Sequence, residues 1–184
     1  MKLFMLLLGC TPKGRNTEQH DIFFGIADRI KDLIPEIIAS WPEAKGNIHV
    51  DAWREVNYVN GRQVQIIERS KKVCDTTNER LFFINLGGYK QNEFEEFHYK
   101  ILVAAENKSV AIKQAKTTAF YKHVGFKGAA SHIDDKYGVG VDDIFEIEDI
   151  LPKQVKEKYS VVLSRSAEIK EDEMHLGYFR LEKL

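Results

Sequence analysis

Residues 81–106 read LFFINLGGYKQNEFEEFHYKILVAAE, and this stretch decides the fold because it repeats the start of the chain. When residues 2–28 are aligned with residues 80–106, seven of 27 positions are identical, whereas unrelated sequences would share roughly one or two. The identical pairs are Leu3 and Leu81, Phe4 and Phe82, Leu8 and Leu86, Gly9 and Gly87, Glu18 and Glu96, His20 and His98, and Ala27 and Ala105. A fixed offset of 78 residues relates all of them, so the sequence predicts a tandem duplication.

Each copy is expected to hold two strands, a helix and two more strands. Residues 3–8 and 81–86 are almost wholly apolar, which is typical of buried strands, and residues 18–27 and 96–105 follow as second strands. Apolar residues at helical spacing predict a helix over residues 30–41. If Asp32 caps this helix, Pro35 lies in its first turn, and an earlier start would leave a kink at Pro35. Alanines at every fourth position predict a second helix over residues 109–123. Asn60-Gly61 predicts a two-residue hairpin turn, because both residues tolerate a positive φ.

These elements predict an α+β fold made of two tandem β-β-α-β-β repeats related by an approximate two-fold axis. The first repeat is expected to span residues 1–70 and the second residues 78–152, with a polar linker over residues 69–79. Residues 159–163 and 178–181 have no counterpart in the first copy. We expect them to form a C-terminal hairpin, within residues 153–184, that packs on the second repeat.

Composition and charge exclude several classes of partner. The 184 residues carry a net charge of −1, with acidic and basic residues interspersed, so nucleic acid and anionic membranes are not expected as partners. No apolar run approaches the length of about 18 residues that a membrane helix needs. The apolar start resembles a short secretory signal, but the same pattern recurs in mid-chain, so we interpret it as a strand. Cys10 and Cys74 form no C-x-x-C pair, which favours a reducing cytoplasm.

A motif that occurs twice resembles a known family. It consists of Leu-Gly-Cys or Leu-Gly-Gly, about eight residues, Glu-x-His, a helix, and then His-Val-Asp or His-Ile-Asp. This motif is similar to that of a bacterial domain of unknown function, number 1543, and the resemblance extends over residues 1–152. The second copy is nearer the family pattern, since the first departs from it at Cys10 and Gln19. The resemblance implies a small, soluble bacterial protein, and it implies no activity.

Histidines and carboxylates at the duplicated positions are the candidate site residues. At an offset of 83, His49-Val50-Asp51 is echoed by His132-Ile133-Asp134. Each such histidine has a carboxylate two residues away, and side chains two apart on a strand point to the same face. If the strands are neighbours, each copy gathers two imidazoles and two carboxylates. The candidate ligand-binding and metal-ligating residues are Glu18, His20, His49, Asp51, Glu96, His98, His132 and Asp134.

Three interpretations of these residues are open at this point. They could form His–carboxylate hydrogen bonds that fasten two strands together, they could bind a divalent metal, or they could act in acid–base catalysis. The sequence favours fastening, and with it a non-catalytic binding or interaction protein that forms a homo-oligomer. The alternative is a divalent-metal-binding protein or a metal-dependent enzyme. The sequence identifies no catalytic residue and no small-molecule ligand.

Overall fold

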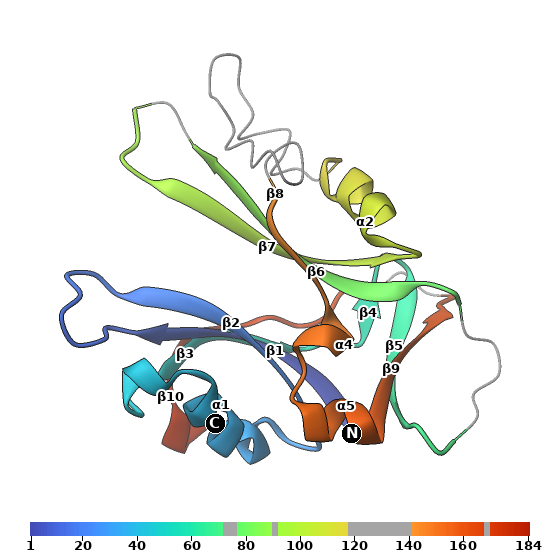
Figure 1. Ribbon diagram of the computed structural model, residues 1–184, viewed down its shortest axis with the longest axis horizontal. Coiled ribbons are helices and arrows are strands. Elements are labelled where there is room, and N and C mark those ends of the chain that lie inside the picture. The colour runs from blue at the N-terminus through green and yellow to red at the C-terminus, as the bar shows by residue number, and fades with distance from the viewer. Residues whose placement is uncertain (72–76, 90–91, 118–140, 168–169) are drawn as a thin grey trace. The chain divides into compact units, whose positions relative to one another are not determined.

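A computed structural model describes residues 1–71, 77–89, 92–117, 141–167 and 170–184 (Figure 1). The described chain is a mixed α/β structure with antiparallel sheets, and far more of its residues lie in strands than in helices. It divides into two compact units. Unit 1 comprises Met1–Cys74 together with Leu151–Leu184, and unit 2 comprises Asp75–Ile150. The division after residue 74 falls within the polar segment that the sequence predicted as a linker.

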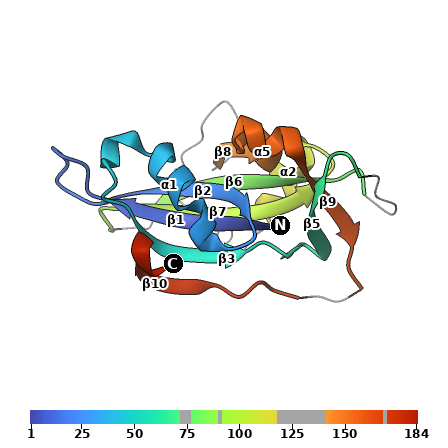
Figure 2. The same ribbon diagram turned by 90° about the horizontal axis from the view of Figure 1, so that it is seen from below.

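The main sheet of unit 1 has four antiparallel strands in the order β10-β3-β1-β2. These strands are β1 (Lys2–Cys10), β2 (Gln19–Ala27), β3 (His49–Glu55) and β10 (His175–Arg180). β1 is the central strand, and its even-numbered side chains lie in the core that also contains Leu33 and Ile37, which explains their apolar character. Figure 2 shows β10 running beside β3, at the outer edge of this sheet.

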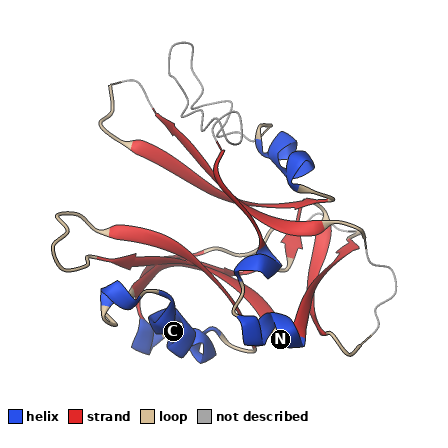
Figure 3. Cartoon of the chain, in the orientation of Figure 1, coloured by secondary structure: helices blue, strands red, loops and turns tan. Residues whose placement is uncertain are grey.

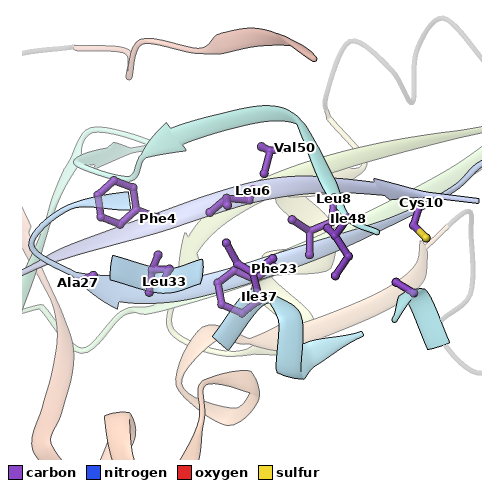
Figure 4. Close-up of a cluster of buried hydrophobic side chains, with 11 residues drawn as sticks. Phe4, Leu6, Leu8, Cys10, Phe23, Ala27, Leu33, Ile37, Ile48 and Val50 are labelled. Atoms are coloured by element: carbon purple, nitrogen blue, oxygen red, sulfur yellow. The ribbon is translucent and has the colours of Figure 1, made fainter. Parts of the chain in front are cut away.

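One face of the main sheet is covered by a short helical segment between β2 and β3. It consists of a 3-10 helix at Ile30–Leu33, the helix α1 (Ile34–Ser40) and a 3-10 turn at Pro42–Ala44. Pro35 lies in the first turn of α1, as expected, where its missing N–H is harmless. Alternate residues of β1, including Leu6 and Leu8, point into a core with Leu33 and Ile37 (Figure 4). The other face of the sheet carries the odd-numbered residues of β1.

Unit 1 also contains a second sheet with the strand order β4-β5-β9. Its strands are β4 (Tyr58–Val59), β5 (Arg62–Glu68) and β9 (Tyr159–Arg165), and the helix α5 (Lys153–Lys158) precedes β9. The predicted turn at Asn60-Gly61 joins β4 to β5, and both residues have a positive φ, of 50° and 71°. The two C-terminal strands are not paired with each other, which corrects the predicted hairpin. Instead β9 pairs with β5 and β10 pairs with β3.

Unit 2 contains a three-stranded antiparallel sheet in the order β7-β6-β8. Its elements are β6 (Arg80–Tyr89), β7 (Glu96–Ala105), α2 (Lys108–Ala115), β8 (Val141–Glu146) and α4 (Ile147–Ile150). The side chain of Asn107 caps α2 by accepting a hydrogen bond from the backbone N–H of Val110. Ala111 and Ala115 face the sheet and complete a core with the even-numbered residues of β6.

Strands dominate the described part of the chain (Figure 3). The three-stranded parts of the two sheets have corresponding strand order and register. In β1 and β2, Gly9 is opposite His20, and in β6 and β7, Gly87 is opposite His98. Both central strands then meet a β-bulge on the third strand, at Leu7/Leu8 in unit 1 and at Asn85/Leu86 in unit 2. The offset is 78 residues along the first two strands and 91 residues between Val50 and Val141 on the third.

Candidate functional site

Site 1 is a cluster of two histidines and two carboxylates on the main sheet of unit 1: Glu18, His20, His49 and Asp51. The sequence predicted these four residues together, and the structure brings them together. Nε2 of His49 lies 3.0 Å from Oε1 of Glu18 and 3.3 Å from Oδ1 of Asp51. Nε2 of His20 lies 3.2 Å from Oδ2 of Asp51 and 3.7 Å from Oε2 of Glu18. Each imidazole nitrogen is therefore within 4 Å of both carboxylates.

A glycine in the central strand allows these side chains to meet. His20 and His49 are on β2 and β3, which flank β1 rather than pairing with each other, so about 9–10 Å separates their backbones. Both histidines are opposite Gly9 of β1. A Cβ atom at Gly9 would lie 2.4 Å from Nε2 of His49 and 2.5 Å from Oδ2 of Asp51. The absence of a side chain at this position leaves the space that the imidazole and the carboxylate occupy.

The β-bulge positions the fourth residue of site 1. Leu7 is opposite Ala52 and Leu8 is opposite Val50, so Asp51 is the extra residue of the bulge. A bulge redirects the side chain of its extra residue, and bulges are frequent beside functional sites. Asp51 therefore joins His49 because of this irregularity, whereas the sequence analysis expected simple strand alternation to align them.

Two atoms of site 1 are buried without a hydrogen bond to any part of the chain that the structure describes. These atoms are Nε2 of His49 and Oδ2 of Asp51. The His49 side chain is only 9% exposed, and the ring of Tyr178 stacks on it with 4.3 Å between the ring centroids. The side chains of Glu18 and His20 are 42% and 41% exposed, so the site is open to solvent on their side. A buried polar atom without a partner costs free energy, which makes these two atoms candidates for an additional ligand.

Site 2 is the corresponding cluster of unit 2, and its described members are Glu96, His98 and Asp142. Their ligand atoms all lie within 4.8 Å of one another. Nε2 of His98 is 3.3 Å from Oδ2 of Asp142 and 4.0 Å from Oε2 of Glu96. A Cβ atom at Gly87 would lie 2.1 Å from Oδ2 of Asp142, so this glycine has the same role as Gly9.

Asp142 is the residue that the sequence analysis missed. It is the extra residue of the bulge in β8, because Asn85 is opposite Asp143 and Leu86 is opposite Val141. The sequence analysis assigned the corresponding position to Asp134, and both His132 and Asp134 lie outside the described residues. The usable signal was the dipeptide Val-Asp, which occurs as Val50-Asp51 and again at residues 141–142.

The residues next to the two sites differ in polarity. On the same face as site 2, Asn85 is opposite both Lys100 and Asp143. Nδ2 of Asn85 donates to Oδ2 of Asp143 at 3.3 Å, and Nζ of Lys100 donates to the carbonyl of His98 at 3.4 Å. Burial lowers the pKa of Lys100 from its ordinary value. The corresponding positions beside site 1 hold apolar residues, namely Leu7, Ile22 and Ala52.

Cys10 is not a member of site 1, although it follows Gly9. Its side chain is buried in the apolar core on the helix-covered face of the sheet. Burial and, to a lesser extent, the negative charge of Glu18 raise the pKa of the Cys10 thiol. The thiol is therefore protonated at neutral pH and is a poor ligand or nucleophile.

One family model matches part of the chain. Residues 15–66 match the family model described as Domain of Unknown Function (DUF1543). The match lies within unit 1 and covers all four residues of site 1, whereas the resemblance seen in the sequence extended over both copies. No curated protein matches the chain.

A solved structure shares the fold. The crystal structure of a protein Il1583 from Idiomarina loihiensis is 20% identical, with a TM-score of 0.64, and the alignment covers 98% of this chain and 97% of that one. At this identity the similarity concerns the fold alone. None of the described helices is long and apolar enough to cross a membrane.

Proposed function

We propose that this protein binds divalent metal ions at site 1 and site 2. The observation that supports this most directly is the convergence of imidazole nitrogens and carboxylate oxygens around a glycine, with two of these atoms buried and not hydrogen-bonded. Neutral imidazole and carboxylate are suitable ligands for zinc, manganese and iron. Metal binding accounts for the buried atoms, because a metal ion would accept their lone pairs.

The spacing of the ligand atoms can be compared with that around a metal ion. Ligands at about 2.1 Å from a metal lie about 3.0 Å apart in an octahedral arrangement and about 3.4 Å apart in a tetrahedral one. In site 1 the His–carboxylate distances range from 3.0 to 3.7 Å, and His49 and His20 contact different oxygens of each carboxylate. In site 2 one ligand atom from each of Glu96, His98 and Asp142 lies within 4.8 Å of the others. Fastening through His–carboxylate hydrogen bonds, which the sequence favoured, agrees less well, because Nε2 of His49 forms none with the described residues.

We infer further that the two units are copies of one ββαβ module. Identical hairpin register, a bulge at the same place and a glycine under each site support this inference. The module is shorter than the predicted β-β-α-β-β repeat, since the described part of unit 2 contains no counterpart of the β4–β5 hairpin. A metal site shared by both copies would explain why Glu18, His20 and Gly9 recur while most surrounding residues do not.

The test is the metal content of the full-length, untagged protein. After purification without chelator, or after incubation with Zn²⁺ or Mn²⁺ and desalting, we expect up to two metal ions per chain by elemental analysis. The double variants Glu18→Gln/His20→Ala and Glu96→Gln/His98→Ala should each lose one of them. Metal below about 0.1 per chain under all these conditions would refute the proposal. His175→Ala is the matched control, since this histidine stacks on Trp53 outside both sites.

The sequence also favoured an interaction protein that forms a homo-oligomer, and β10 supports this as a second candidate function. This outer strand exposes large apolar side chains, with Leu176 72% and Tyr178 67% exposed. An exposed strand edge is a template for pairing with another chain. Sedimentation velocity would show a dimer that Leu176→Lys dissociates, and a monomer at high protein concentration would contradict it.

A further inference from the structure

We infer that unit 2 binds the zwitterionic group of an α-amino acid through Asn85, Lys100 and Asp143, which we call the polar row. Asn85 of β6 is opposite Lys100 of β7 and opposite Asp143 of β8, so the three residues lie side by side across the sheet. Asn85 is two residues from Gly87, so the polar row lies on the face that carries site 2, about 7 Å from it along the strand. The inference goes beyond metal binding, because the polar row acts through its own side chains.

Asn85 presents a hydrogen-bond acceptor that no described residue uses. Its Nδ2 donates to Oδ2 of Asp143 at 3.3 Å, which fixes the orientation of the amide. Its Oδ1 is buried and accepts no hydrogen bond from the described residues. A buried amide oxygen without a donor costs free energy, so this position favours a ligand that brings a donor group.

Lys100 presents a positive charge without a carboxylate partner among the described residues. Its side chain is partly buried, and Nζ donates to the backbone carbonyl of His98 at 3.4 Å. An ammonium group has three donors and no acceptor, so two donors remain for a ligand. A carboxylate suits them best, because hydrogen bonds between charged groups are shorter and stronger than neutral ones.

The two groups together select the class of ligand. Side chains directly opposite each other on antiparallel strands have Cβ atoms about 4.5–5.5 Å apart, so the carboxylate for Lys100 and the donor for Asn85 must be close together. Asp143 adds a negative charge on the far side of Asn85, which favours an ammonium donor over a hydroxyl. An α-amino acid carries a carboxylate and an ammonium on one carbon atom. The next row holds Phe83 and Leu102, which are buried and apolar, so the polar stretch is one row long and fits a small charged group.

The corresponding row of unit 1 supplies the test variants. It contains Leu7, Ile22 and Ala52, whose side chains carry neither a charge nor a hydrogen-bonding group. Asn85→Leu and Lys100→Ile place the residues of unit 1 at the corresponding positions of unit 2. The strand pairing of unit 1 accommodates these side chains, so both variants should fold.

Ligand-observed NMR on the full-length protein, freed of metal with a chelator so that no probe binds through a metal ion, provides the test. The probes are glycine, acetate, which lacks the ammonium group, and methylammonium, which lacks the carboxylate. We expect saturable binding of glycine to the wild type, with each of the other two probes about three- to tenfold weaker, since one net hydrogen bond contributes on this scale. His175→Ala is the control and should bind glycine as the wild type does.

The variants separate recognition from a purely structural role of the polar row. Asn85→Leu should weaken the binding of glycine and leave that of acetate unchanged, so the preference for glycine is lost. Lys100→Ile should weaken both acids about tenfold or more, and Lys100→Arg should restore most of the affinity, because it keeps the positive charge. Cooperative thermal unfolding near the wild-type Tm shows that each variant is folded.

The outcomes distinguish this inference from the proposed function. A wild type that does not bind glycine refutes the inference. An unchanged preference for glycine over acetate in folded Asn85→Leu, or an unchanged affinity in folded Lys100→Ile, refutes it as well. All these measurements are made without metal, so they leave the proposed metal binding intact. Conversely, a protein that takes up no metal but binds glycine refutes the proposed function alone.

Discussion

Site 1 and site 2 have the same scaffold and different surroundings. In both, a glycine of the central strand is opposite a histidine of the second strand, and a bulge on the third strand turns an aspartate toward that histidine. Site 1 adds His49, which is buried beneath Tyr178, and it is bordered by apolar residues. Site 2 lacks that imidazole among its described residues and is bordered by Asn85, Lys100 and Asp143.

Features that occur in both sites belong to the module, and features that differ between the sites are not required by it. The glycine, the Glu-x-His pair and the bulged aspartate are present in both units, so these are the features that a shared site requires. The fourth ligand and the adjacent row differ, and these features determine access and charge. The shared residues are similarly exposed in the two sites, since the His20 side chain is 41% exposed and the His98 side chain 36%. The feature that site 1 adds is the buried His49 side chain, which is 9% exposed.

Replacing Gly9 and Gly87 by alanine should have the largest effects on metal binding at the two sites. A methyl group at Gly87 collides with the carboxylate of Asp142, which is the end of a flexible side chain, so Gly87→Ala should weaken metal binding at site 2 by about 10- to 100-fold with a smaller effect on stability than Gly9→Ala. At Gly9 the methyl group meets the buried ring of His49, which cannot move freely. Gly9→Ala should therefore also lower the free energy of unfolding by about 1–3 kcal/mol, as overpacking does.

Isothermal titration with Zn²⁺ and urea denaturation measure the two effects separately. Gly25→Ala is the control, because its Cβ would collide with Leu33 on the helix-covered face, far from the ligands along β2. It should lower stability and leave the metal stoichiometry at the wild-type value. Equal effects of Gly9→Ala and Gly87→Ala on stability would show that the two sites are equally buried in solution.

The sequence was sufficient for the strands, for all four residues of site 1 and for two of the three described residues of site 2, for physical reasons. Strand alternation and the offset of 78 residues correctly placed Glu18 beside His20 and Glu96 beside His98. The predicted turn at Asn60-Gly61 is confirmed. It was predictable because the conformation of a two-residue hairpin turn depends on local backbone preferences. The bulge was not predictable, since an extra residue in one strand leaves no mark on the hydrophobic pattern, and Asp142 was missed for that reason.

The pairing of the C-terminal strands depends on contacts that are distant in sequence. Periodicity indicated strands near residues 159–163 and 178–181, but it carries no information about the partner of a strand. Pairing of β9 with β5 and of β10 with β3 makes both strands part of unit 1, where residues such as Leu163 are buried. A hairpin between neighbours was the simplest expectation, and the structure replaces it with two separate long-range pairings.

Replacing Tyr178 tests the contribution of the aromatic stack on His49 to metal binding at site 1, and the expected effect is smaller. Its ring stacks on His49, and such a pair contributes about 0.5–1.5 kcal/mol, so Tyr178→Ala should weaken Zn²⁺ binding at site 1 about two- to tenfold. The Zn²⁺ affinity is measured by calorimetry in the Glu96→Gln/His98→Ala background, in which only site 1 binds the metal. His175→Ala removes the other aromatic stack of β10, on Trp53, and should leave the affinity unchanged. Equal affinities for all three proteins would mean that the stack does not position His49.

The helices that cover the two sheets differ as well, and this difference gives the smallest and most pH-dependent effect. α2 contains no acidic residue, whereas Glu36 of α1 has Oε2 buried without a hydrogen bond to the described residues, and burial raises the pKa of its carboxyl above the ordinary value. A raised pKa means that the folded protein holds this proton more tightly than the unfolded chain does. Stability is therefore lost as the pH rises through the pKa of the folded state, and the ionised carboxylate is a cost at pH 7.

Glu36→Gln removes that cost, so the variant should be slightly more stable than wild type at pH 7, and the difference should shrink as the pH falls below the ordinary pKa of a glutamate. Thermal denaturation between pH 3 and pH 8, analysed as the difference between variant and wild type, measures this directly. Glu43→Gln, on the following 3-10 turn, is the matched control for the loss of one negative charge. A difference that is constant across the pH range would mean that Glu36 has the same pKa in the folded and unfolded chains, and that α1 and α2 cover their sheets on equal electrostatic terms.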